Sequence, residues 1–254
     1  MGPLLLALLE SLSLYVWGEP DEKLLAFCAE KKVTRLYLMF SGKETPKLRP
    51  FVQAARAAKI DVHAMHPGDM AEWLDPFPAR LDPKPILDWV DAALKTGLFD
   101  GIHLDIEPHA TPGWKTHRLQ LAAGYLDLLR QVRAKGKFTF SAAVPHNWDR
   151  DDLKIDGKPL IDHVQDILDH VSVMAYRGRN IEKVLESIEH ECNYKPGRVE
   201  LIQETDPKAV EEGVPLHVGT QSRLDEIFAA ARAKFGAALP LAVHHYATWR
   251  DLPQ

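Results

Sequence analysis

Three ionisable side chains alternate with three apolar ones in the segment 101–107. In a β-strand, successive side chains point to opposite sides, so His103, Asp105 and Glu107 would share one face. The opposite face would carry the apolar residues Ile102, Leu104 and Ile106. Burying three ionisable groups together costs several kcal/mol unless they are paired or hydrated. The pattern therefore indicates a functional site rather than a purely structural strand.

Asp105 and Glu107 are two carboxylates separated by one strand repeat. Two neighbouring carboxylates repel each other and compete for protons, so the pKa of one of them should rise towards neutrality. A carboxyl group with such a pKa suits general acid catalysis near pH 7. We expect Glu107, the outer of the two, to be the acid and Asp105 to be its partner.

The segment 100–107 resembles the Asp-Gly-x-Asp-x-Asp-x-Glu strand of family 18 chitinases and related endo-N-acetylglucosaminidases. Segment 173–176, Val-Met-Ala-Tyr, is similar to the Met-x-Tyr-Asp motif on the sixth strand of that family. Segment 141–145 is similar to its fifth-strand run of small residues that ends in proline. The resemblance covers about a third of the chain, and two positions differ: His103 replaces the middle aspartate, and Arg177 replaces the aspartate after the tyrosine.

The resemblance implies a role for three residues. In family 18, the glutamate is the general acid, and the neighbouring aspartate orients the acetamido group of the substrate, which acts as internal nucleophile. The tyrosine hydroxyl supports the ring that forms. By position, these residues are Glu107, Asp105 and Tyr176.

A second carboxylate, Glu204, ends the segment 199–204. A glutamate followed by proline on strand four, with another glutamate on strand seven, is similar to the broad clan of retaining glycosidases. There the second glutamate is the nucleophile, and the two carboxyl groups lie about 5 Å apart. Glu204 is thus a candidate nucleophile, and the alternative is that it pairs with Arg177 across the mouth of the site.

Aromatic and polar side chains gather at the ends of the expected strands. Aromatic faces pack on the C–H surfaces of sugars while their polar tips form hydrogen bonds. Trp249 lies about where family 18 enzymes carry the tryptophan beneath the cleaved sugar. Other aromatic residues near strand ends include Trp73. The residues expected to bind substrate are His103, His66, His109, His146, Arg177, Trp249, Tyr246 and Trp17.

The same histidines allow another interpretation, a metal-dependent hydrolase that uses His66, His109 and His146 with Asp105. Against it, the first strand lacks His-x-His, and no His-Glu-x-x-His motif occurs. Glycine-rich nucleotide loops and the Gly-x-Ser-x-Gly elbow are also absent from the sequence. We therefore expect neither a catalytic metal nor a cofactor.

The elements that must position these residues repeat eight times along the chain. Short β-branched or aromatic runs alternate with longer segments of helical periodicity, at about 32 residues per unit, the size of a βα repeat. This predicts a single (β/α)8 TIM barrel over residues 1–254, with an open, doubly wound sheet as the alternative. The expected strands are 13–18, 33–41, 60–66, 101–107, 138–145, 171–176, 199–204 and 241–246.

The composition of the chain excludes several other classes of protein. The 254 residues carry 31 Lys and Arg against 36 Asp and Glu, and 46% are hydrophobic. Nucleic acid is an unexpected partner at this charge, and no apolar stretch approaches the roughly 20 residues of a membrane span. Cys28 and Cys192 lie far apart in segments expected to be helices, so we expect two packed thiols rather than a disulfide.

We therefore expect a glycosidase acting on an oligosaccharide or polysaccharide, as a monomer or weak homodimer. It would be cytoplasmic, or the mature form of an exported protein. The alternative is a barrel of the same kind that binds carbohydrate without cleaving it.

Overall fold

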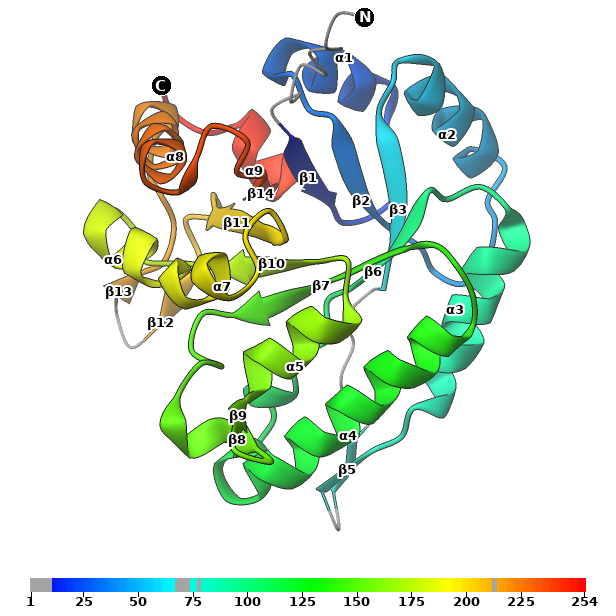
Figure 1. Cartoon of the computed structure of the whole chain (residues 1–254). Helices are drawn as coiled ribbons and strands as arrows, with labels where there is room; N and C mark the ends of the chain where they lie inside the picture. The colour runs from blue at the N-terminus through cyan, green and yellow to red at the C-terminus, as the bar shows by residue number, and fades with distance from the viewer. Residues whose placement is uncertain (1–10, 67–73, 77–78, 212–213) are drawn as a thin grey trace, which may run out of the picture.

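A computed structural model describes residues 11–66, 74–76, 79–211 and 214–254, and its centre is a closed barrel of eight parallel strands (Figure 1). β1 pairs with β2 on one side and with β14 on the other, which closes the sheet. The predicted (β/α)8 barrel is confirmed, and the doubly wound alternative is wrong. The barrel strands are β1 (Leu12–Val16), β2 (Arg35–Met39), β3 (Asp61–Met65), β6 (Gly101–Leu104), β7 (Thr139–Pro145), β10 (His170–Met174), β11 (Val199–Glu204) and β14 (Leu241–His244).

Helices surround the barrel in chain order, from α1 in blue to α9 in red (Figure 1). Asp21 caps α1, because its carboxylate accepts the backbone N–H groups of Lys23 and Leu24. Thr220 caps α8, because its side chain accepts the backbone N–H of Arg223. The helices are α1 (Glu22–Lys31), α2 (Leu48–Ala57), α3 (Lys84–Thr96), α4 (Trp114–Ala134), α5 (Leu160–Ile167), α6 (Ile181–Glu186), α7 (Glu189–Tyr194), α8 (Gln221–Phe235) and α9 (Tyr246–Arg250), with 3-10 turns at Pro108–Ala110 and Asp151–Leu153.

Three short antiparallel hairpins lie in the segments that follow β3, β7 and β11. Strands of two or three residues are too short to show a period, so the sequence did not reveal them. They belong to the loops at the carboxyl end of the barrel, the end at which TIM barrels carry their sites. The hairpins are β4 (Leu74–Pro76) with β5 (Ala79–Leu81), β8 (Lys154–Ile155) with β9 (Lys158–Pro159), and β12 (Val210–Glu211) with β13 (Val214–Pro215).

The apolar core has two parts, separated by the barrel wall. The outer core lies between strands and helices, and it includes Ile102, Leu104 and Ile106 as the alternation in segment 101–107 predicts. The inner cluster fills part of the barrel, and Trp17, Met39, Met174 and Tyr176 pack against it. It consists of Tyr15, Tyr37, Met65, Ala143, Ile202 and Ala242.

The rest of the barrel interior is polar and hydrogen-bonded. Glu200 is fully buried, and its carboxylate accepts hydrogen bonds from Ser13 Oγ at 2.5 Å, Tyr37 Oη at 2.8 Å and Ser172 Oγ at 2.6 Å. Charge-assisted hydrogen bonds of this kind compensate for the loss of water around a buried charge.

The described helices include none that is long and apolar enough to cross a membrane. Cys28 and Cys192 are both free thiols, as expected.

Candidate active site

Asp105 and Glu107 follow the end of β6 and continue its alternation. Ile106 between them is buried in the outer core, which turns both carboxylates to the mouth of the barrel. Asp105 Oδ1 is buried and has no hydrogen-bond partner among the described residues. Burial raises the pKa of Asp105, because a desolvated carboxylate favours its neutral form.

Glu107 has the pKa of a general acid. Burial and, after it, the charge of Asp105 raise this pKa to about 7. His109 Nε2 lies 3.5 Å from Glu107 Oε2, but burial lowers the pKa of His109 to about 4. The imidazole is therefore neutral at pH 7 and does not hold Glu107 in its charged form.

Tyr176 lies close to both residues, just beyond β10. Burial raises its pKa well above the usual range, and the charges of Glu204, Asp105 and Glu107 raise it further. Its side chain packs on the inner cluster, which fixes the ring at the mouth. The phenol stays neutral at any physiological pH and is available as a hydrogen-bond donor.

Glu204 is held by three neighbouring groups and has little freedom to react. Its Oε1 accepts the backbone N–H groups of Thr205 at 2.8 Å and Asp206 at 2.7 Å. Its Oε2 lies 2.8 Å from His244 Nδ1, and Trp17 Nε1 donates to His244 Nε2 at 2.8 Å. Because the indole N–H can only donate, Nε2 of His244 is the acceptor, and its Nδ1 carries the proton that Glu204 accepts.

This arrangement makes Glu204 an anchor for the loop after β11 and for His244. Only 4% of Glu204 is exposed, and both of its oxygens have partners, so the geometry does not present a free nucleophile. Its side-chain partner is His244, and among the described residues no ion pair joins it to Arg177. The sequence did not indicate the pairing of His244 with Glu204, although the register of the barrel sets these two residues side by side.

His103 lies inside the barrel rather than at its mouth. It has no exposed surface, its Nε2 is 2.9 Å from Tyr15 Oη, and its Nδ1 is 2.8 Å from Ser141 Oγ. Its ring also stacks on Tyr37, with centroids 3.9 Å apart. The position of His103 does not allow the substrate contact that the sequence suggested, and its role in the structure is to fill the barrel.

Tyr246 and Trp249 also lie away from the mouth. Both belong to α9 and pack edge-on against Phe27 of α1, outside the barrel. Trp249 Nε1 donates to Gln221 Oε1 at 2.8 Å, and Tyr246 Oη donates to Asp21 Oδ1 at 3.3 Å. The strand ends at His244, so these side chains follow the helix and not the barrel wall.

Of the remaining aromatic and polar candidates, Trp17 lies at the mouth, where it packs on the inner cluster and binds His244. Arg177 lies beside Tyr176, donates to Ser187 Oγ at 3.3 Å and contacts Nε2 of His146. Trp73 lies outside the described residues.

His66, His109 and His146 are separate neutral side chains. Burial lowers the pKa of each to about 4. His66 packs edge-on against Trp89, and His146 lies against Arg177. Within the part of the chain that the structure describes, no three His, Cys, Asp or Glu side chains gather as metal ligands, so the metal-dependent alternative gains no support.

Solved structures to which the chain is similar include chitinases and an endo-β-N-acetylglucosaminidase. A family 18 chitinase from Pseudoalteromonas aurantia superposes with a TM-score of 0.65 at 11% identity, over 93% of this chain and 94% of the other. A fungal family 18 endo-β-N-acetylglucosaminidase superposes with a TM-score of 0.64 at 16% identity, over 93% of this chain and 90% of the other. A chitinase from Aspergillus fumigatus superposes with a TM-score of 0.63 at 14% identity, over 93% of this chain and 91% of the other. No model of a known protein family matches the sequence, and neither does any curated protein. The expected likeness to family 18 therefore holds at the level of the fold.

Proposed function

We propose that this chain is a glycoside hydrolase that cleaves the bond following an N-acetylated sugar, with Glu107 as general acid and base. The observation that carries the proposal is the pair of Asp105 and Glu107 at the barrel mouth, with the pKa of Glu107 raised to about 7. The similar structures, chitinases and an endo-β-N-acetylglucosaminidase, support a substrate that contains N-acetylglucosamine.

In the proposed reaction, the acetamido oxygen of the substrate attacks the anomeric carbon while the glycosidic C–O bond breaks. Glu107 gives its proton to the departing oxygen, and Asp105 accepts a hydrogen bond from the acetamido N–H. Water then opens the resulting oxazolinium ring, and the Glu107 carboxylate takes the proton of that water. The buried Oδ1 of Asp105, which has no partner among the described residues, supports this role because it leaves an acceptor for the substrate.

The engagement of Glu204 favours this pathway over double displacement. A nucleophilic carboxylate needs a free oxygen facing the anomeric carbon, and retaining pairs stand about 5–5.5 Å apart. Both oxygens of Glu204 already accept hydrogen bonds, from Thr205, Asp206 and His244. We therefore assign Glu204 a positioning role through His244.

The test measures hydrolysis of chitotetraose by wild type, Glu107→Gln and a control. Glu186→Gln serves as the control, since Glu186 is an exposed carboxylate at the end of α6. We expect Glu107→Gln to lose at least about 100-fold in kcat/KM and the control to be unchanged, because this is the usual scale of acid and base catalysis. Equal activity of Glu107→Gln and wild type contradicts the proposal.

A second measurement separates the two pathways and the non-catalytic alternative. A thiazoline analogue of the oxazolinium intermediate should inhibit the substrate-assisted reaction, whereas a 2-fluoro glycoside would label Glu204 in a double displacement. A carbohydrate-binding barrel would show neither effect, and chitotetraose would raise its Tm without ever being cleaved.

A further inference from the structure

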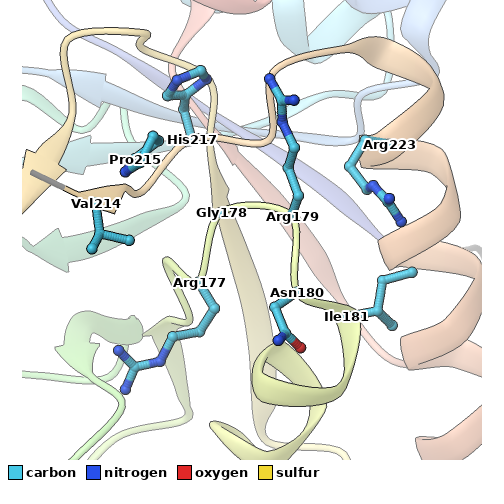
Figure 2. Close-up of a pocket in the computed structure, with 9 residues that line it drawn as sticks. All are labelled: Arg177, Gly178, Arg179, Asn180, Ile181, Val214, Pro215, His217 and Arg223. Carbon is cyan, nitrogen blue, oxygen red and sulfur yellow. The ribbon is translucent and has the colours of Figure 1, made fainter.

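A basic cleft opens beside the candidate active site. A pocket of about 700 Å³ is lined by Arg177, Arg179 and Arg223 together with His217 (Figure 2). A second pocket of about 450 Å³ shares Arg177 and Asn180 with the first and reaches Tyr176 at the barrel mouth. We call these two adjoining pockets the basic cleft; one of them reaches Tyr176 and the other reaches Arg223 of α8.

The charge of this cleft is opposite to that of the whole chain, whose net charge is −5. None of the described residues that line the larger pocket is acidic. The smaller pocket adds Lys183 as a further cation and Glu211 as the one carboxylate among its described lining residues. A local excess of cations on an acidic protein indicates an anionic ligand.

Two of the arginines have no carboxylate partner in the described part of the chain. Arg177 binds Ser187 and contacts His146, and no ion pair is formed by Arg179 with any described residue. Arg223, in contrast, pairs with Glu226 at 2.7 Å. The guanidinium groups of Arg177 and Arg179 therefore keep donors for a ligand.

The loop that carries these arginines is built closely against its neighbours. Gly178 has φ of +56°, and a Cβ there would lie 2.5 Å from Pro215 O. Its N–H donates to Leu216 O at 3.1 Å, which ties the loop after β10 to the segment that follows β13. A Cβ on Gly219 would lie 2.5 Å from Arg179 Nη2, so this glycine leaves the space that the Arg179 side chain occupies. The backbone beside Arg179 is thus fixed, and the space for its side chain is preserved, although the side chain itself is exposed.

The cations are distributed along the cleft and do not converge on one point. In Figure 2, Arg177 and Arg179 leave their loop in opposite directions, and Arg223 approaches from α8. Such spacing fits an extended chain with acidic groups at successive positions better than a single compact anion. His217 Nδ1 is buried without a hydrogen-bond partner and adds one more polar atom beside this cleft.

From this juxtaposition we infer that the cleft is a subsite for an acidic saccharide, one that carries carboxylate or sulfate groups on sugars flanking the cleaved bond. Arg179 and Lys183 bind those groups, with Arg177 next to Tyr176. The inference rests on the proposed function, because it names the class of saccharide that the same site takes.

The test compares three saccharides with one backbone: chitotetraose, its C6-carboxylate form and its 6-O-sulfate form. Binding is measured by calorimetry in the Glu107→Gln background, so that no probe is consumed. We expect one or both anionic forms to bind about tenfold to a hundredfold more tightly than chitotetraose, the range of one charge-assisted hydrogen bond. The arm that gains affinity identifies carboxylate or sulfate as the recognised group. Equal affinity of all three saccharides overturns the inference.

Arg179→Gln should remove this preference and leave the affinity for chitotetraose unchanged. The matched control is Arg250→Gln, because Arg250 is an exposed arginine that pairs with Asp251. This variant should keep the preference for anionic saccharides. A loss of the preference in both variants, or in neither, also overturns the inference.

Hydrolysis by wild type separates the two proposals. A preference for anionic saccharides without any cleavage refutes the proposed function and keeps the subsite. Cleavage of chitotetraose with equal affinity for all three saccharides refutes the subsite and keeps the function.

Discussion

The protonation of Glu107 is the property on which the proposed chemistry depends, and it can be measured without a substrate. Burial and the charge of Asp105 raise the pKa of Glu107 from 4.5 to about 7. At pH 7 a carboxyl group with a pKa of 4.5 is protonated in about 0.3% of molecules, whereas one with a pKa of 7 is protonated in about half. The environment thus increases the acid form by a factor of roughly 150 at pH 7.

The perturbation that tests this reasoning is Asp105→Asn, which removes the charge and keeps the shape. Because the negative charge of Asp105 raises the pKa of Glu107, the variant should lower that pKa, while the contribution of burial remains. In the wild type, kcat/KM should fall about tenfold for each pH unit above 7, since only the protonated acid can assist the departing oxygen.

The assay is a carbon-13 NMR titration of protein labelled at the glutamate side-chain carboxyl carbons. The resonance that disappears in Glu107→Gln belongs to Glu107. We expect its midpoint near pH 7 in wild type and at a lower pH in Asp105→Asn. A midpoint near 4.5 in wild type, or one that Asp105→Asn does not move, refutes the reasoning.

Two further predictions concern stability. Glu191 in α7 is 1% exposed, and burial raises its pKa to about 8, above the 4.5 of an unperturbed glutamate. The stability linked to this group is present below pH 4.5 and is lost as the pH rises through 8, by at most about 5 kcal/mol. Urea unfolding should therefore show Glu191→Gln to be more stable than wild type at pH 8.5 but not at pH 5, and an equal difference at both pH values contradicts this. A Cβ on Gly101 would lie 2.8 Å from the buried ring of His63, so Gly101→Ala should lower the free energy of unfolding by about 1–3 kcal/mol. Denaturation of the double variant Gly101→Ala/His63→Ala should give less destabilisation than the two single effects added together, and strict additivity would show that the two side chains do not collide.

The fold was predictable because its signal is periodic and repeats. Each barrel strand carries its own alternation, and in segment 101–107 the residues Ile102, Leu104 and Ile106 occupy the outer core as the pattern requires. Eight such units within 254 residues leave few other architectures. The pairing of Asp105 with Glu107 follows from the same alternation, since the segment after β6 continues it and Ile106 between them is buried in the outer core.

The depth of a side chain inside the barrel was not predictable from the pattern. Alternation tells which residues point inward but not how deep they lie, and His103 comes two residues before Asp105 along the barrel wall. At that depth His103 has no exposed surface and bonds to Tyr15 and Ser141 instead of a substrate. Tyr246 and Trp249 were misplaced for a related reason, because the change from strand to helix at His244 turns the chain out of the barrel.

The polar interior and the acidic mouth depend on each other. Burial holds the pKa of His103 well below its usual range, so the residue beneath Asp105 is neutral and offers no positive charge to stabilise the carboxylate above it. Asp105 is desolvated, and its Oδ1 has no partner within the described chain, so its charge acts on Glu107 with little screening. Glu204, with its own hydrogen bonds, fixes His244 and through it Trp17 at the rim. The side chains inside the barrel therefore fill it and position the rim, and burial together with the charge of Asp105 raises the pKa of Glu107 to about 7, the value that general acid catalysis requires.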